Sequence, residues 1–203
     1  MRDWWLRVFL VLQRPRPVFV ALRDDSKESL ADRAEPVLAI VLLAGIATVL
    51  ATRTAGQLLD DPSYDGLLVA VWTFIAGSLY GMGGYFAIGA LLHRSAKALG
   101  SQGSYRRARH VLAFAGVPIA LSLALWPVKL ALYGESLFRS GGSDHGAGIV
   151  AFDAVEIALL IWAAALLVVG TRAVHGWTWA RAGAACALAI AAAAIVGAIL
   201  ASL

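Results

Sequence analysis

The sequence predicts an all-α membrane protein, a helical bundle that crosses the bilayer about five times. Hydrophobic residues make up 60% of the 203 positions and charged residues only 15%, against averages of roughly half and about a quarter in globular proteins. The apolar residues are gathered into five runs, each near the roughly 20 residues that a helix needs to cross the hydrocarbon core. Lipid offers the backbone no hydrogen-bond partner, and no alternating barrel pattern is present, so the runs are expected to be helices.

The chain is predicted to have two parts. Residues 1–35 form a cytoplasmic amphipathic segment, and residues 36–203 form the five-helix transmembrane domain. The predicted spans are residues 36–54, 67–92, 111–133, 149–170 and 182–203.

Within the first part, residues 4–12 are predicted to form a short helix with an apolar face, and Pro15 and Pro17 end it. Trp4 and Trp5 are expected to contact lipid or a partner. The mixed-charge stretch that follows, residues 23–35, is either a surface helix opening near Asp25 or Ser26 or a solvated linker.

The basic residues predict the orientation. If the spans alternate in direction, fourteen of the 17 Lys and Arg residues fall on one side, while Arg53 and Arg139 fall on the other and Lys129 lies inside the third span. The positive-inside rule then places the amino terminus in the cytoplasm and the carboxyl terminus outside, with the chain in the cell membrane. The net charge of +4 is thus explained by topology, and no nucleic-acid partner is expected.

The loop between the second and third spans is the most basic part of the chain. It carries no acid and five cations, which are Arg94, Lys97, Arg106, Arg107 and Arg109. Such a loop is expected to lie against anionic headgroups of the lipid bilayer or against a partner. The two loops on the other side, residues 59–66 and 134–148, are rich in turn-forming residues and are expected to be mobile.

Small residues mark two helix-packing surfaces. Gly77 and Gly81 form a small-xxx-small pair in the second span, and a stripe that includes Ala189, Ala193 and Gly197 recurs along the fifth. Packing within the bundle is the favoured interpretation, and the alternatives are a homo-oligomer interface and a pore lined by the glycines.

Three charged residues fall inside predicted spans, namely Lys129, Asp153 and Glu156. Charges are costly in hydrocarbon and are therefore usually paired or functional. All three lie at a similar depth near the outer face, so an interhelical ion pair is predicted. A structural clasp is the preferred role, and an ion or proton site is the alternative.

Local catalytic motifs are missing from the sequence. It contains no Gly-x-Ser-x-Gly, no His-Glu-x-x-His and no phosphate-binding Gly-x-x-x-x-Gly-Lys. No catalytic residue, metal site or cofactor is predicted, and the chain is not expected to be an enzyme.

Two motifs resemble those of bacterial members of the Yip1 family of five-span membrane proteins. The first is Leu12-Gln13-Arg14-Pro15 with Phe19 and Leu22, ahead of the first span. The second is Gly103-Ser104-Tyr105-Arg106-Arg107 followed by Val111, Phe114, Ala115 and Pro118. Tyr105 stands where that family more often has Phe, and its eukaryotic Asp-Leu-Tyr-Gly-Pro motif is not evident.

The resemblance implies a role in membrane traffic or membrane shaping, or as an accessory of an ABC-type exporter. The expected function is therefore that of a non-enzymatic adaptor or membrane organiser, acting through residues 4–22 and 94–110. The alternative is a small transporter or channel that uses Lys129, Asp153 and Glu156.

Overall fold

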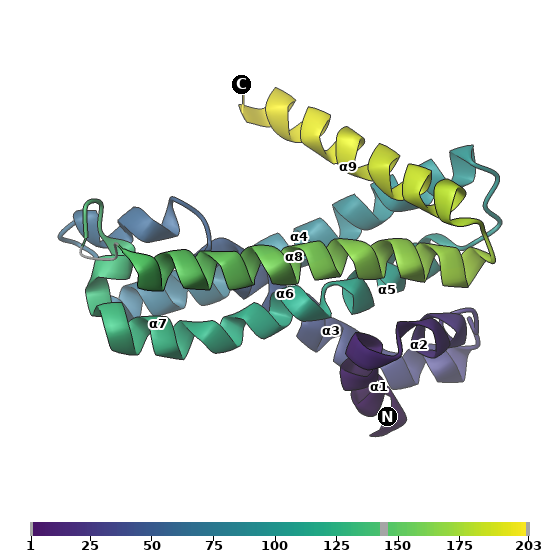
Figure 1. Ribbon diagram of the computed structural model, residues 1–203, viewed down its shortest axis with the longest axis horizontal. Coiled ribbons are helices and arrows are strands. Elements are labelled where there is room, and N and C mark those ends of the chain that lie inside the picture. The colour runs from purple at the N-terminus through teal and green to yellow at the C-terminus, as the bar shows by residue number, and fades with distance from the viewer. Residues whose placement is uncertain (1, 143–145, 202–203) are drawn as a thin grey trace.

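The computed structural model describes residues 2–142 and 146–201, and every regular element in these ranges is a helix. Five helical segments are long and apolar enough to cross a membrane. In Figure 1, α8 runs along the bundle's long axis, α1 and α2 lie together beside one end, and α9 diverges from its neighbours toward the carboxyl terminus. The elements in chain order are α1 (Arg2–Gln13), α2 (Pro15–Ala21), α3 (Lys27–Leu50), η1 (Ala55–Asp60), α4 (Gly66–Ala98), α5 (Tyr105–Ala115), α6 (Val117–Ser122), η2 (Leu123–Leu125), α7 (Trp126–Tyr133), η3 (Gly134–Phe138), α8 (Ala147–His175) and α9 (Trp179–Ala201).

Capping residues explain where several of the helices begin and end. The side chains of Ser26, Asp65 and Ser104 accept hydrogen bonds from backbone amides at the starts of α3, α4 and α5, as N-cap residues do. Gly176, at φ 67°, ends α8 in the left-handed conformation that glycine adopts without strain. The mixed-charge stretch is therefore helical from Lys27 onward, and α3 ends at Leu50 rather than continuing to residue 54.

The third span, Tyr105–Phe138, is assembled from several short helices. Pro118 stands near the start of α6, just after the helix breaks at Gly116, and Pro127 stands near the start of α7. Proline lacks an amide donor and clashes with the preceding turn, so each proline starts a new helical segment.

Glycines bring α3 and α4 into close contact. A Cβ atom at Gly77 would lie 2.6 Å from the Ile46 Cα, and one at Gly81 would collide with the Val41 carbonyl. On the facing helix, a Cβ at Gly45 would lie 2.6 Å from the Gly81 Cα. Gly77 and Gly81 thus form an interface within the chain, where only glycine permits this backbone approach.

The stripe on α9 is packed over only part of its length. Ala189 is buried, Ala193 is half-buried, and a Cβ at Gly197 would meet no atom within 4 Å. Residues 202–203 of the predicted fifth span lie outside the described residues.

The amino-terminal helices pack into the main hydrophobic core. Val11, Val18 and Phe19 are 0–1% exposed and belong to the same cluster as Val111 and Phe114. The expectation that Trp4 contacts lipid or a partner is wrong: the residue is only 5% exposed, and the centre of its ring lies 5.7 Å from that of Phe114. The short helix has two apolar faces, and the bundle covers one of them.

The two loops expected to be mobile pack against each other. Arg139 donates to the Leu59 carbonyl at 2.9 Å, and the Ser140 amide donates to Asp60 at 2.8 Å. Leu59 and Phe138 are buried in one cluster with Trp126. The turn-forming composition concealed these apolar anchors; residues 143–145 of the second loop lie outside the described residues.

Candidate functional site

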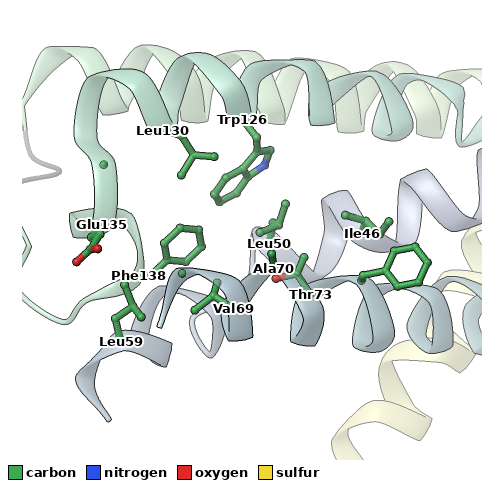
Figure 2. A pocket seen from close by; sticks show the side chains of 13 residues that line it. Ile46, Leu50, Leu59, Val69, Ala70, Thr73, Trp126, Leu130, Glu135 and Phe138 are labelled. Atoms are coloured by element: carbon green, nitrogen blue, oxygen red, sulfur yellow. The ribbon is translucent and has the colours of Figure 1, made fainter. Parts of the chain in front are cut away.

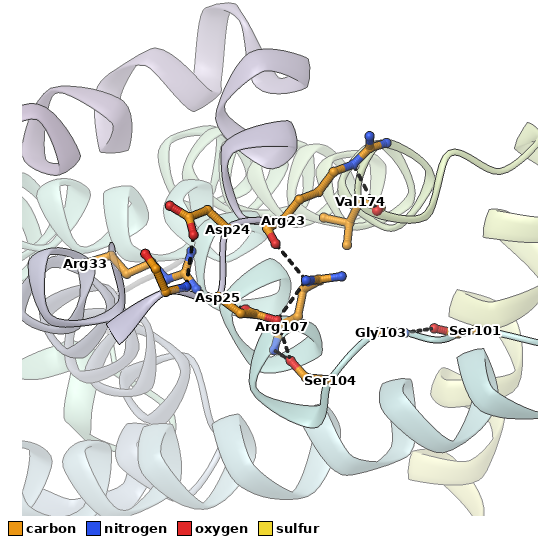
Figure 3. Close-up of polar contacts among 10 residues, drawn as sticks. Arg23, Asp24, Asp25, Arg33, Ser101, Gly103, Ser104, Arg107 and Val174 are labelled. Carbon is orange, nitrogen blue, oxygen red and sulfur yellow. Dashed lines mark hydrogen bonds and ion pairs between the residues drawn. The ribbon is translucent and has the colours of Figure 1, made fainter. Parts of the chain in front are cut away.

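The two motifs that carry the family resemblance meet at one end of the bundle, here called the basic end. It comprises α1, α2, residues 22–26, residues 94–110 and the α8–α9 turn. Figure 3 shows the polar contacts that join its segments. Their centre is Asp25, a residue that the sequence indicated only as a helix start.

Asp25 bridges the amino-terminal segment and the start of α5. Its carboxylate lies 2.8 Å from the Arg107 guanidinium, accepts from the Ser104 hydroxyl at 3.2 Å, and lies 3.4 Å from Arg33. Arg107 also donates to the Arg23 carbonyl at 2.7 Å. Of the five cations expected to face lipid or a partner, Arg107 is therefore committed to contacts within the chain.

Arg33 is the charged residue that sequence reasoning missed. Its side chain is fully buried in α3, and its guanidinium carbon lies 5.6 Å from the centre of the Trp4 ring. A buried guanidinium is costly unless it is paired, and Asp25 provides the ion pair. The near balance of acids and bases in residues 23–35 was the available signal for such a pair.

Two more arginines tie the helix ends together. Arg23 donates from Nε to the Ala173 and Val174 carbonyls at 3.1 Å, near the carboxyl end of α8. Arg181 donates to the Leu99 carbonyl at the end of α4. Carbonyls in the last turn of a helix have no partner within the helix, so both arginines hold helix ends that would otherwise be unsatisfied.

Arg109 is held in a different way, by aromatic rings. Its guanidinium carbon lies 5.0 Å from the ring centre of Tyr85 and 4.6 Å from those of Phe86 and Tyr105. Its stem crosses α4 at Gly89, where a Cβ atom would lie 3.4 Å from the Arg109 Cα. No ion pair joins Arg109 to another residue of the described part of the chain.

The remaining predicted contact residues are exposed. Arg94, Lys97 and Arg106 lie open at the basic end. The uncovered face of α1 is apolar and consists of Trp5, Leu6, Phe9 and Leu10, each at least 37% exposed. This surface is here called the α1 face. The Asp25 network joins the segment that follows α2 to the start of α5.

The intramembrane charges lie toward the opposite end. Lys129 Nζ lies 2.9 Å from Glu156 Oε1, joining α7 to α8, and the ammonium lies 4.8 Å from the Trp126 ring centre. Asp153 departs from the expectation: it is exposed and has no ion pair within residues 2–142 and 146–201. Asp153 and Glu156 both line a cavity of about 560 Å³ between α3, α6 and α8.

A second cavity at this end is almost entirely apolar. It measures about 500 Å³ and is lined by Leu50, Val69, Trp126 and Phe138 among others (Figure 2). Its inner polar group is the Thr73 hydroxyl, which is buried and has no hydrogen-bond partner among the residues described. The one carboxylate on its wall, Glu135, pairs with Arg139.

Three exposed carboxyls outside the spans, those of Asp24, Asp60 and Asp61, have a lowered pKa. The backbone amide of Ser26 lowers the pKa of Asp24, because it donates to the ionised carboxylate. Hydrogen bonds from the Ser140 side chain and amide lower the pKa of Asp60. In the described ranges no three His, Cys, Asp or Glu side chains form a group that could hold a metal ion.

A helical bundle with five apolar segments of this length defines a multi-pass integral membrane protein. The comparison with family models matches the Yip1 domain over residues 9–201, nearly the whole chain, and the chain belongs to the Yip1 domain family. No curated protein and no solved structure matches it.

Proposed function

We propose that this chain is a non-enzymatic adaptor or organiser that binds another membrane protein, such as an ABC-type exporter, through its basic end. The observation that supports this most is the Asp25–Arg107 ion pair at 2.8 Å, which joins the segment after α2 to the start of α5. It connects the amino-terminal helices, which carry the apolar α1 face, to the loop that carries the exposed cations. An exposed apolar face such as that of α1 is typical of an interaction site. The positive-inside rule favours the cytoplasmic side of the cell membrane for this end.

The rigidity of this surface favours binding over catalysis. Two of the arginines at the basic end, Arg23 and Arg181, are used to satisfy backbone carbonyls, and Arg33 and Arg107 share one carboxylate. They fix the relative positions of α1, α3, α5 and α8, and a preorganised surface loses less entropy when a partner binds.

Site-specific crosslinking in native membranes tests the proposal. A photo-reactive amino acid at Phe9 or Arg94 is expected to yield the same adduct with one membrane protein. The matched control is Leu132, an exposed apolar position at the opposite end. Equal yields of that adduct from all three positions would contradict a dedicated surface at the basic end.

A second candidate function, a small transporter, is favoured by the cavity beside the intramembrane charges. Asp153 has no ion pair in the described part of the chain, and it lines that cavity together with Glu156. Flux in proteoliposomes that is abolished by Glu156→Gln and by Asp153→Asn would favour the transporter over the adaptor.

A further inference from the structure

We infer that the chain holds one anionic glycerophospholipid in a defined site, with the headgroup phosphate on Arg106 and Arg109 and one acyl chain in the groove beside Tyr85. This inference rests on the proposed function in one respect, the placement of the basic end at a membrane surface. A defined site differs from general attraction to anionic lipid, because particular side chains bind one lipid molecule.

The headgroup part of the site is a cavity of about 440 Å³ at the start of α5. Its walls are Asp25, Ser104, Tyr105, Arg106 and Arg109. The Asp25 carboxylate does not oppose an anion here, because Arg33, Arg107 and the Ser104 hydroxyl already bind it. Arg106 and Arg109 therefore leave the cavity with excess positive charge.

Arg109 is the residue of this cavity best suited to bind an anion. Three aromatic rings hold its guanidinium in place, and the Nε atom is buried without a hydrogen-bond partner among the described residues. The Tyr105 hydroxyl donates to the Phe86 carbonyl at 2.8 Å, which fixes one of those rings. An immobilised guanidinium that lacks a carboxylate partner is suited to a phosphate, whose oxygens match its planar set of donors.

The groove for the acyl chain is linked to the headgroup cavity by the contact between Tyr85 and Arg109. It has a volume of about 370 Å³ and is lined by Tyr85, Gly81, Gly84, Ile88 and, among others, apolar residues of α3, α5 and α6. Tyr85 lines this groove while its ring lies under Arg109, which lines the headgroup cavity. Charge and apolar surface thus adjoin in the order in which a phospholipid presents its headgroup and its tail.

The glycines of α4 make the groove. A Cβ atom at Gly84 would lie in ordinary contact with the Ile88 side chain, at 3.8 Å, so a larger side chain there would extend into the groove. At the neighbouring Gly83, which does not line the groove, a Cβ atom would meet nothing within 4 Å. These adjacent positions provide a blocking variant and a matched control.

Thermal unfolding of the purified full chain in an uncharged detergent tests the inference. Added phosphatidylglycerol is expected to raise the Tm with a saturable dependence, because a ligand that binds only the folded state stabilises it. Phosphatidylcholine and inorganic phosphate are expected to have little effect, because the first carries no net charge and the second has no tail. Arg106→Gln, Arg109→Gln and Gly84→Leu should each raise the half-saturating lipid concentration at least tenfold.

The controls are Arg94→Gln, which removes a charge at the same end but outside the cavity, and Gly83→Leu. Both should keep the wild-type response. If Arg94→Gln weakens the response as much as Arg106→Gln, the attraction is diffuse and the site is refuted. A wild-type response in Gly84→Leu, or an equal Tm rise with inorganic phosphate alone, refutes the acyl groove. The unfolding assay contains no partner protein, so a negative result would not contradict the adaptor proposal. Conversely, failure to obtain the crosslinked adduct would not contradict the lipid site.

Discussion

Arg107 and Asp25 form an ion pair of 2.8 Å across 82 residues of sequence. Through it the segment ahead of the first span is joined to the start of the third. The same carboxylate is the partner of the buried Arg33, so one acidic side chain holds α3, α5 and the amino-terminal helices in register.

Replacing Asp25 by Asn should destabilise the protein by about 1.5–3 kcal/mol, the usual range for hydrogen bonds to charged groups. The reason is that Arg33 would remain buried without an anion. Thermal unfolding in detergent measures the loss. Glu35→Gln, an exposed change of the same kind, is the control and should leave the Tm nearly unchanged; an equal loss in both variants would refute the role given to Asp25.

Replacing Lys129 by Met should destabilise the protein because Glu156 would be left without its cation. Breaking a buried pair costs about 3–5 kcal/mol, and the lower end is expected because Glu156 is 20% exposed. The double variant Lys129→Met with Glu156→Gln should recover part of the loss. Asp153→Asn should change the stability by less than about 0.5 kcal/mol. No recovery in the double variant would mean that Lys129 acts by packing alone.

Replacing Gly45 by Ala should disrupt the contact between α3 and α4. Overpacking typically costs about 1–3 kcal/mol, and the new methyl group would collide with the backbone of Gly77 and Gly81. Gly197→Ala, made where no atom lies within 4 Å, is the matched control. Unfolding in detergent should show a loss only for Gly45→Ala, and an undiminished Tm would show that the two helices lie farther apart.

Acid should loosen the contact between η1 and the loop after η3. Ser140 lowers the pKa of Asp60 below its ordinary value of 3.8. A carboxyl whose pKa is lower in the folded than in the unfolded protein stabilises the folded state at pH values above the unfolded-state pKa. This stabilisation is lost as the pH falls through the folded-state pKa, which for Asp60 lies below 3.8. An acid-stable protease should therefore cleave η1 and the loop after η3 faster below pH 3.8 in the wild type, when cleavage is followed from pH 5 downward.

The Asp60→Asn variant serves as the control for that acid effect. Its cleavage rate should lack the wild-type acceleration below 3.8, because the Asp60 carboxyl has been removed. If this variant keeps the wild-type acceleration, another carboxyl is responsible.

The helical class of the fold was predictable because hydrocarbon imposes one requirement on every residue of a span: its backbone must be satisfied locally. Depth along a helix also carried information, since Lys129 and Glu156 were expected at one level and lie 2.9 Å apart. Asp153 does not join this ion pair, because Lys129 offers a single ammonium group and Glu156 binds it.

The centre of the basic end was not predictable from the sequence. Asp25 stands in a stretch where several acids are equivalent by composition, and its partner Arg107 is 82 residues away. Gly45 was overlooked for a similar reason: its small size matters only because Gly77 and Gly81 face it. Trp4 was misplaced because a short helix with two apolar faces does not reveal which one the bundle covers.

The most direct test of the proposed function is whether the α1 face and the basic loop bind a partner as one surface. Photo-crosslinking from Phe9 in native membranes, with and without Asp25→Ala, measures this. We expect a single membrane-protein adduct whose yield falls at least tenfold in Asp25→Ala and is unchanged in Glu35→Ala, with both variants present at wild-type levels. An adduct whose yield is the same in all three proteins would contradict the proposed function.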